Sequence, residues 1–336
     1  MSADAAVVWH TIGTIYEELS DYERAGAAYR RAEVILDGHR GDDAVTSVRI
    51  IIASSIARLQ RILGSLDEAE NLYTQTIELA EQHYGEDSAE VASMLNDLAV
   101  VYKYAARFDE AEALYRRALP IIEAARGMDH VDVATIWHNL GGVEHARGNF
   151  STGETYARRA VEIRQTALGW THVAVARDVA ALAALVQEQN RLDEAERLYR
   201  RALDVFEKQF GPVHYELAVN YNNLAAVHAA RGMFPQAEEL YLRAIDIKIQ
   251  LLGPSHPDVA VSLHNLAIMT VRQGDDERAR DLFARAVQIF ETGLGADHPK
   301  TLASRGELAA GGGAQQPAAI SGLSKSLSKS AIRVSQ

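Results

Sequence analysis

Residues 96–127 read NDLAVVYKYAARFDEAEALYRRALPIIEAARG and contain two apolar stripes with helical spacing. Leu98 and Tyr102 belong to the first stripe, and Ala111 and Tyr115 belong to the second. Apolar residues that recur at three- and four-residue intervals predict an amphipathic helix. The segment therefore predicts two helices joined by a short turn.

The same pattern recurs along the chain with a period of 42 residues. Glycines keep this spacing at 85, 127, 169, 211, 253 and 295, and leucines keep it at 98, 140, 182, 224 and 266. An earlier unit has Gly41, which lies 44 residues before Gly85. A fixed period of this length is typical of a helical repeat array, so we expect about seven units that start near residue 7.

Small residues and rings alternate at matching places in each unit. The second helix has Ala at 69, 111, 195, 237 and 279, and four residues later come Tyr73, Tyr115, Tyr199, Tyr241 and Phe283. A ring of this kind buries about 150 to 250 Å² when it is enclosed. One helix pair cannot cover such a surface, so neighbouring units are expected to stack.

These boundaries give a solenoid over residues 1–310 and a flexible Gly/Ser-rich basic tail over 311–336. The expected repeats lie near 7–46, 47–90, 91–132, 133–174, 175–216, 217–258 and 259–296, with a capping helix at 297–310.

Composition excludes several classes of protein. The chain has no cysteine, which removes disulfides, thiolate metal sites and cysteine nucleophiles. The first residues do not resemble a secretory signal, and no run is long enough to span a membrane, so a cytoplasmic location is expected. The formal net charge is −12, although 311–336 has three basic residues and no acid. A body this acidic argues against nucleic-acid binding.

The residues resemble a known family. The first unit is similar to the tetratricopeptide repeat (TPR) signature at every position, with Trp9, Ile12, Gly13, Tyr16, Ala25, Tyr29 and Ala32. Later units, such as YNNLAAVHAARGMFPQAEELYLRAI at 221–245 and LGPSHPDVAVSLHNLA at 252–267, resemble the 42-residue repeats of kinesin light chains. The resemblance implies an all-α fold, a right-handed superhelix whose first helices line a concave groove that holds a peptide segment of a partner.

Five histidines stand three residues after a periodic glycine and could be mistaken for a metal or catalytic site. They are His130, His172, His214, His256 and His298. Neighbouring repeats are separated by about 10 Å, whereas zinc ligands converge within about 2 Å of the ion. We therefore expect each imidazole to form a hydrogen bond near the start of the next helix.

No catalytic or cofactor motif is found in the sequence. HExxH, GxSxG and GxxxxGK[ST] motifs are all absent. We therefore expect a protein that is not an enzyme and that has no cofactor and no metal site.

The candidate binding residues lie on one stripe of the first helices. The polar members of this stripe are Asn96, Asn139, Asn222, Asn223, His264 and Asn265. The resemblance implies that these asparagines bind the main chain of an extended peptide, because a carboxamide is both a donor and an acceptor. The alternative is that some of them pair between neighbouring helices.

Cations on or beside the same stripe predict the ligand's charge. They are Arg58, Arg61, Lys103, His145 and Arg177, and they favour an acidic peptide. Alanines at 180, 181, 184 and 226 leave space for a bulky side chain. The sharper hypothesis is an acidic peptide with an aromatic anchor.

Two features predict local departures from the repeat. The fourth unit has Glu144, Gly153 and Ala157 where a Tyr, an Ala and a ring are expected, and this predicts the softest joint of the array. Pro120 lies inside a helical pattern and is expected to kink or end that helix, whereas Pro235 is favourable at a helix start.

The function predicted from these observations is a non-enzymatic adaptor or scaffold for a partner's peptide segment. The alternative is a regulatory or sensory subunit that is controlled by its own tail or by oligomerisation. Residues 320–335 would as a helix separate apolar from basic side chains. Three roles are considered for this segment. It is an inert tail, it is a ligand for the acidic solenoid, or it makes a weak contact with a partner or a membrane.

Overall fold

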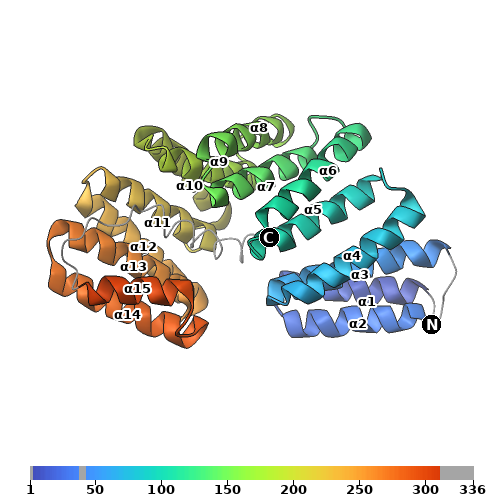
Figure 1. Ribbon diagram of the computed structural model, residues 1–336, viewed down its shortest axis with the longest axis horizontal. Helices are drawn as coiled ribbons and strands as arrows, with labels where there is room; N and C mark the ends of the chain where they lie inside the picture. Colours follow the sequence, from blue (N-terminus) through green and yellow to red (C-terminus); the bar gives the residue numbers. More distant parts are fainter. Residues whose placement is uncertain (1–2, 38–42, 311–336) are drawn as a thin grey trace. The chain divides into compact units, whose positions relative to one another are not determined.

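The structure is a computed structural model that describes residues 3–37 and 43–310. The described residues form fifteen α-helices and no strand (Figure 1). The helices are α1 Ala3–Glu18, α2 Tyr22–Asp37, α3 Asp43–Leu63, α4 Leu66–Tyr84, α5 Ala89–Tyr104, α6 Phe108–Arg126, α7 Val131–Arg147, α8 Phe150–Leu168, α9 Val173–Glu188, α10 Leu192–Phe210, α11 Tyr215–Ala230, α12 Phe234–Leu252, α13 Pro257–Gln273, α14 Asp276–Leu294 and α15 Pro299–Ala309.

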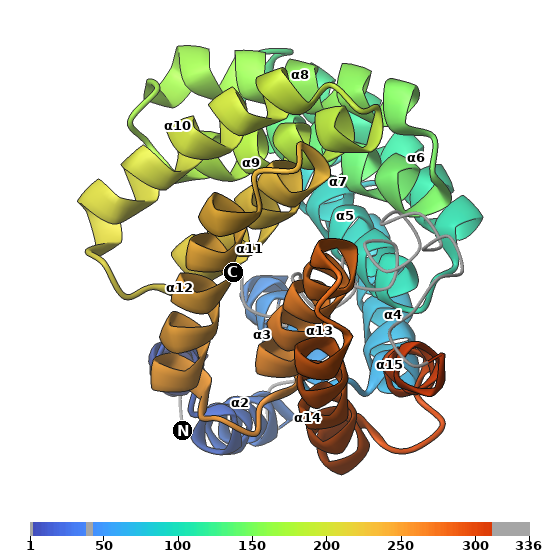
Figure 2. The same cartoon turned by 90° about the vertical axis from the view of Figure 1, so that its left-hand side faces the viewer.

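The helices are organised in pairs, as the sequence predicted. In the pair α11 and α12, for example, the two helices pack together and α12 also packs on α13 of the next pair (Figure 2). The same order begins with α1 and α2, and the last described helix, α15, packs on α14. The all-α repeat fold is therefore confirmed.

The chain divides into two compact units. Unit 1 runs from Met1 to Val143 and unit 2 from Glu144 to Gln336, so the boundary falls inside α7. Gly41 and the basic tail at 311–336 lie outside the described residues.

Small residues and rings fill the interior of each unit. Tyr73 and Tyr115 of unit 1, and Tyr199, Tyr241 and Phe283 of unit 2, are all buried. The alanine that precedes each ring by four residues is also buried. Because each ring fills the space beside a small residue, the stacking predicted from the sequence is confirmed.

The first helices of neighbouring pairs contact one another. This is observed for α1 with α3 and α3 with α5 in unit 1, and for α9 with α11 and α11 with α13 in unit 2. The accessible sides of α1, α3 and α5 are called the inner face of unit 1. Those of α9, α11 and α13 are called the inner face of unit 2.

The five turn histidines cap the helices that follow them. The Nδ1 atom of His172 accepts a hydrogen bond from the backbone N–H of Ala174 at 3.1 Å. His130, His214, His256 and His298 make the same contact at 3.2 Å with the backbone N–H two residues later. The preceding glycine, for example Gly253 with φ of 85°, provides the left-handed turn that starts this connection. The predicted role of these histidines is confirmed.

The two prolines differ in their effect. Pro235 occupies the first turn of α12, as predicted. Pro120 was expected to kink or end its helix; it lies inside α6, which continues to Arg126, so the helix does not end there. The residues after Pro120 contribute Ile121 and Ile122 to the core, and this burial holds the last turns in helical conformation.

The fourth helix pair, α7 and α8, has an unusual interior. Ala157 is buried where other pairs have a ring, and Gly153 is buried in the first turn of α8. Glu144 replaces an aromatic residue and is buried. Its carboxylate accepts hydrogen bonds from Arg147 Nη1 at 2.7 Å and from Asn149 Nδ2 at 2.8 Å, so the buried charge is satisfied locally.

Candidate functional site

Two candidate asparagines of unit 1 pair across neighbouring helices. Asn139 Nδ2 of α7 donates to Asn96 Oδ1 of α5 at 2.9 Å, and Asn96 Nδ2 donates to Asp97 Oδ1 at 3.2 Å. Asn96 is half-buried and Asn139 is 9 % exposed. Within the described part of the chain, Asn139 Oδ1 and one N–H of each carboxamide have no hydrogen-bond partner. The alternative of pairing between helices therefore applies here, but the pair keeps hydrogen-bonding capacity.

The asparagines of unit 2 repeat this arrangement three periods later. Asn265 Nδ2 of α13 is 3.4 Å from Asn222 Oδ1 of α11. The side chain of Asn223 forms a hydrogen bond with the Tyr199 hydroxyl. Asn223 and Asn265 are both half-buried. Amide pairs on α5 and α7 and on α11 and α13 thus fix the orientation of four side chains.

His264 has a different role from the one expected. The residue is 1 % exposed, and its Nδ1 lies 2.8 Å from Ser304 Oγ of α15. Its ring packs edge-on against Phe283, and burial lowers its pKa to about 4. Because α14 and α15 enclose the ring, His264 joins α15 to the rest of unit 2 and offers no surface to a ligand.

Two of the candidate arginines form ion pairs within the protein. Arg58 Nε lies 2.8 Å from Glu17 Oε1, and Arg177 Nε lies 2.7 Å from Glu216 Oε1. In each case the partner comes from the neighbouring first helix, and its carboxylate is mostly buried. Much of the positive charge of these two residues is therefore neutralised before a ligand binds.

Arg61 of α3 and Lys103 of α5 are both buried. Arg61 is 9 % exposed, and its guanidinium lies 5.5 Å from the ring centre of Tyr104. Lys103 is 8 % exposed. Burial, and then the positive charge of Arg61, lower the pKa of Lys103 to about 8.

The remaining candidate, His145, packs against an aromatic side chain. Its ring lies 5.7 Å from that of Phe150 in an edge-on arrangement, and the residue is half-buried. The alanines of the inner face of unit 2 are also half-buried, namely Ala180, Ala181, Ala184 and Ala226.

Sequence reasoning missed a buried polar cluster between α11, α12 and α13. Lys248 Nζ donates to Ser262 Oγ at 2.8 Å and to the Asp258 carbonyl oxygen at 3.1 Å, and the Tyr215 hydroxyl donates to Asp258 Oδ2 at 2.6 Å. A lysine beside a serine resembles a nucleophile with its base. Ser262 is 0 % exposed, however, so the pair has no access to a substrate and holds the helices together.

The signal for these contacts was present in the sequence. Arg58 pairs with a residue 41 positions away, Arg177 with one 39 away, and Tyr215 with one 43 away. These separations are close to the repeat length. A search for complementary side chains one period apart would have found them.

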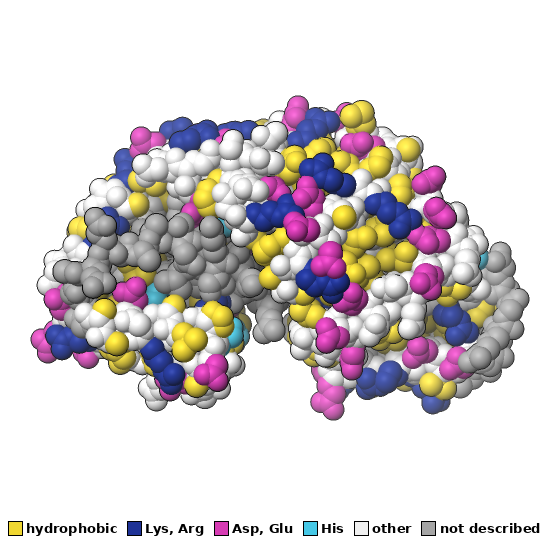
Figure 3. Space-filling model, viewed as in Figure 1, with side chains coloured by type: hydrophobic (Ala, Val, Ile, Leu, Met, Phe, Trp, Pro, Cys, Tyr) yellow, Lys and Arg dark blue, Asp and Glu magenta, His cyan; other side chains and the backbone are white. Residues whose placement is uncertain are grey.

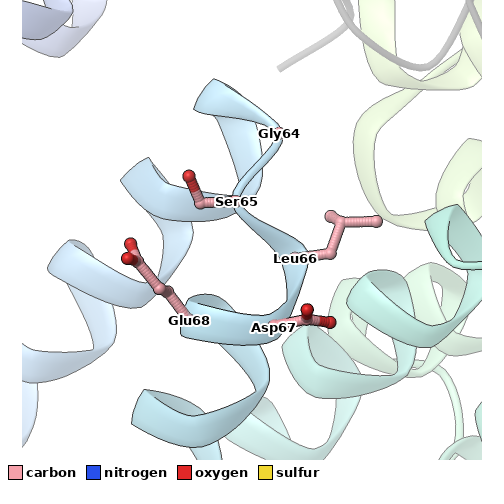
Figure 4. Close-up of a pocket in the computed structure, with 5 residues that line it drawn as sticks. All are labelled: Gly64, Ser65, Leu66, Asp67 and Glu68. Atoms are coloured by element: carbon pink, nitrogen blue, oxygen red, sulfur yellow. The ribbon is translucent and has the colours of Figure 1, made fainter.

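Other surfaces of the described chain carry less chemistry. An open depression at the turn between α3 and α4 is lined by residues 64–68, whose side chains point in different directions (Figure 4). Acidic and basic side chains are interspersed on the face seen in Figure 3. Among the described residues there is no group of three His, Asp or Glu placed to hold a metal, and none of their helices could cross a membrane.

Comparison with protein families identifies the repeat. A family model described as tetratricopeptide repeat matches residues 49–124, 132–208, 177–250 and 216–292, which is more than half of the chain. A second model of the same repeat matches residues 6–33. The sequence matches none of the curated proteins with which it was compared.

Solved structures of similar fold include proteins related to kinesin light chains. BtubC (BKLC) from P. vanneervenii is 23 % identical with a TM-score of 0.55, and the match covers 71 % of this chain and 93 % of that one. A kinesin light chain-like protein with nearly identical TPR-like repeats from Podosopora anserina is 22 % identical with a TM-score of 0.50, covering 61 % and 96 %.

A Rap protein complexed with competence and sporulation factor has a similar fold over a larger part of this chain. It is 12 % identical with a TM-score of 0.62, and the match covers 92 % of this chain and 88 % of that one. At these identities the three structures support the fold of the chain alone.

Proposed function

Because this chain belongs to the tetratricopeptide repeat family, we propose that it is a non-enzymatic adaptor that holds an extended peptide segment of a partner protein. Each unit offers an inner face of its own to such a ligand. Solenoid proteins commonly use such stacked first helices as extended binding surfaces. The observation that carries the proposal is the pair of amides that recurs on α5 and α7 and on α11 and α13.

The chemistry of these amides suits a peptide main chain. A carboxamide has two N–H donors and an oxygen with two lone pairs, so one contact to a neighbouring amide leaves several positions free. Pairing also holds each side chain in one orientation before the ligand arrives, which lowers the entropy lost on binding. Asn139 and Asn265 can therefore bind backbone N–H and C=O groups whatever the peptide's side chains are.

The side chains around the amides favour a particular type of peptide. Arg61 of α3 and Lys103 of α5 contribute positive charge to unit 1, which favours acidic residues in the ligand. In unit 2 the alanines at 180, 181, 184 and 226 are half-buried, and their small side chains favour one large apolar side chain in the ligand. We therefore propose an acidic peptide with an aromatic anchor. A peptide-display selection that enriches basic sequences without aromatic residues contradicts this specificity.

Substitution of the amides tests the binding site. Peptides selected by display on the full-length protein are expected to bind the triple variant Asn139→Ala, Asn223→Ala, Asn265→Ala at least about 5-fold more weakly, because each hydrogen bond that is lost contributes about 1 kcal/mol in whichever unit holds the peptide. Fluorescence anisotropy of a labelled peptide measures the affinity, and circular dichroism checks that the variant is folded.

Asn71→Ala is the matched control, since Asn71 is exposed on α4, which is a second helix. It is expected to bind like the unmodified protein. If the triple variant also keeps full affinity, the asparagines do not form the site.

A second candidate is a regulatory subunit controlled by its own tail. Opposite charge favours it, since residues 311–336 carry three basic residues and the rest of the chain carries the acidic excess. Under this alternative a 1–310 truncation binds the selected peptides more tightly than the full-length protein. Equal affinities exclude control by the tail.

A further inference from the structure

The first helix of the array exposes two large apolar side chains on one side. Val8 is 57 % exposed and Ile15 is 50 % exposed. Together with the half-buried Ala5 and Ile12 they form one stripe along α1, because residues spaced by three and four positions share a helix face. We call these four residues the end face of unit 1.

The other first helices show what normally happens to this stripe. The counterparts of α1 residues lie 44 positions later in α3 and then every 42 positions. From Ile52 of α3 to Ser304 of α15, the counterparts of Val8 are at most 5 % exposed. From Leu59 to Met269, the counterparts of Ile15 are at most 4 % exposed. The end face therefore corresponds to a buried interface between repeats and is distinct from the inner face.

The element that covers this interface elsewhere is the second helix of the preceding pair. Asp178 of α9 is a counterpart of Val8, and it accepts hydrogen bonds from Arg164 of α8. Ser262 of α13 likewise accepts one from Lys248 of α12. In the described part of the chain α1 packs on α2 and α3, and its end face stays exposed. Terminal repeats need a polar outer face for solubility, so an apolar end face indicates that another segment covers it.

The tail, which lies outside the described residues, has the sequence pattern of a suitable helix. Residues 320–334 have apolar side chains on one helical stripe, namely Ile320, Leu323, Leu327 and Val334. As a helix this stripe would extend over about 21 Å, whereas the end face from Ala5 to Ile15 extends over about 15 Å. The segment is therefore long enough to cover the end face.

The same segment does not suit the second helix of an eighth pair on α15. In the register of the repeat, Ser321 corresponds to Ala279 and Lys325 corresponds to the buried ring of Phe283. A lysine at that place would bring a charge into the core, which is costly. The repeat pattern therefore does not assign residues 320–334 to α15.

Charge favours the tail over a second copy of α1 as the occupant of the end face. Helix α1 contains three acids and no lysine or arginine, and two of the acids, Asp4 and Glu18, are exposed near the two ends of the stripe. Residues 311–336 contain three basic residues and no acid. Opposite charges favour association, whereas two copies of α1 would bring like charges together.

We propose that residues 320–334 bind as an amphipathic helix to the end face of unit 1, in the place that a second helix occupies before every other first helix. The apolar stripe of the tail covers Val8 and Ile15, and its positive charge offsets the negative charge of α1. This inference goes beyond the proposed function, because the end face lies outside the surface that is assigned to the peptide.

Hydrogen exchange of the full-length protein, followed by mass spectrometry, tests the contact. Residues 320–334 are expected to exchange about 10-fold more slowly than an unstructured segment of the same sequence, because a docked helix must open before it exchanges. Ile15→Lys should remove this protection, since it places a positive charge in the contact. Ile51→Lys is the matched control and should keep the protection, because Ile51 of α3 is 51 % exposed and lies outside the end face.

A variant of the tail tests the same contact from the other side. In Leu323→Asp, Leu327→Asp, residues 5–15 of α1 are expected to exchange about 10-fold faster than in the unmodified protein. The control Ser321→Asp, Ser328→Asp adds the same charge away from the apolar stripe and should leave the exchange of α1 unchanged. This pair changes no described helix, so it keeps the test valid if Ile15→Lys does not fold.

Three outcomes overturn the proposal. In the first, residues 320–334 of the unmodified protein exchange like an unstructured segment. In the second, Ile15→Lys and Ile51→Lys have equal effects on the tail. In the third, the protection of α1 rises with protein concentration and does not respond to the tail variant, which means that a second copy of α1 covers the end face. None of these measurements uses a peptide ligand, so failure of the proposed function leaves the test intact.

Discussion

At the scale of single residues, the turn histidines explain how each repeat begins. Helices usually start with Ser, Thr, Asp or Asn, whose side-chain oxygen accepts a hydrogen bond from a free backbone N–H. Here the imidazole Nδ1 does this, as His172 does for Ala174 at the start of α9. A ring nitrogen accepts only when it is not protonated, so these caps require neutral histidine.

Substitution of one capping histidine gives a direct test of this role. His172→Ala is expected to lower the free energy of unfolding by about 1 kcal/mol, because a backbone N–H at the start of α9 loses its acceptor. His172→Asn should recover most of the loss, since it restores an acceptor. Urea denaturation followed by circular dichroism measures both variants. Equal losses for Ala and Asn would mean that the imidazole acts through packing and not as a cap.

At the scale of helices, the period determined what the sequence could predict. Helix pairs, their order, the buried rings and the histidine caps all follow from spacings within one repeat, and each is confirmed. The pairing of Arg58 with Glu17 and the enclosure of His264 depend on neighbouring repeats. Single-repeat patterns do not contain that information. The continuation of α6 past Pro120 likewise depends on burial of Ile121 and Ile122, which outweighs a local preference.

The last described helix, α15, should respond to acid through His264. Burial lowers the pKa of His264 to about 4 when α15 is docked. When α15 is released, the ring is exposed and is protonated near pH 6.5. The contribution of neutral His264 to the docking of α15 is therefore complete above pH 6.5 and is lost as the pH falls toward 4. At pH 5 docking of α15 should be weaker by about 2 kcal/mol.

Hydrogen exchange of residues 299–309, corrected for the intrinsic effect of pH, measures this change. The control is His264→Asn, which places at this position the residue that Asn222 provides one repeat earlier. The variant keeps the His298 cap, so the difference between the two proteins isolates His264. Equal protection of α15 at pH 7 and pH 5 in the unmodified protein would contradict the prediction.

At the scale of the whole molecule, stability is distributed along the array. In repeat proteins each repeat contacts only its neighbours, so one weak interface can separate two cooperative parts. The boundary between the compact units lies within α7, and the same helix pair has Ala157 where the others have a buried ring. A missing ring costs on the order of 3 to 5 kcal/mol in a packed core. The sequence therefore predicts a weak joint at this helix pair.

We expect units 1 and 2 to unfold at different urea concentrations. The three tryptophans allow this to be measured, because Trp9 and Trp137 lie in unit 1 and Trp170 lies in unit 2, where it packs against Arg201. A Trp170→Phe variant reports unit 1, and a Trp9→Phe, Trp137→Phe variant reports unit 2. Circular dichroism of each variant follows the unfolding of both units. Fluorescence midpoints that differ between the two variants support a weak joint.

Hydrogen exchange should also be faster at residues 140–165 than in the flanking pairs. Coincident midpoints together with equal protection would show that α7 and α8 couple the units as firmly as any other pair.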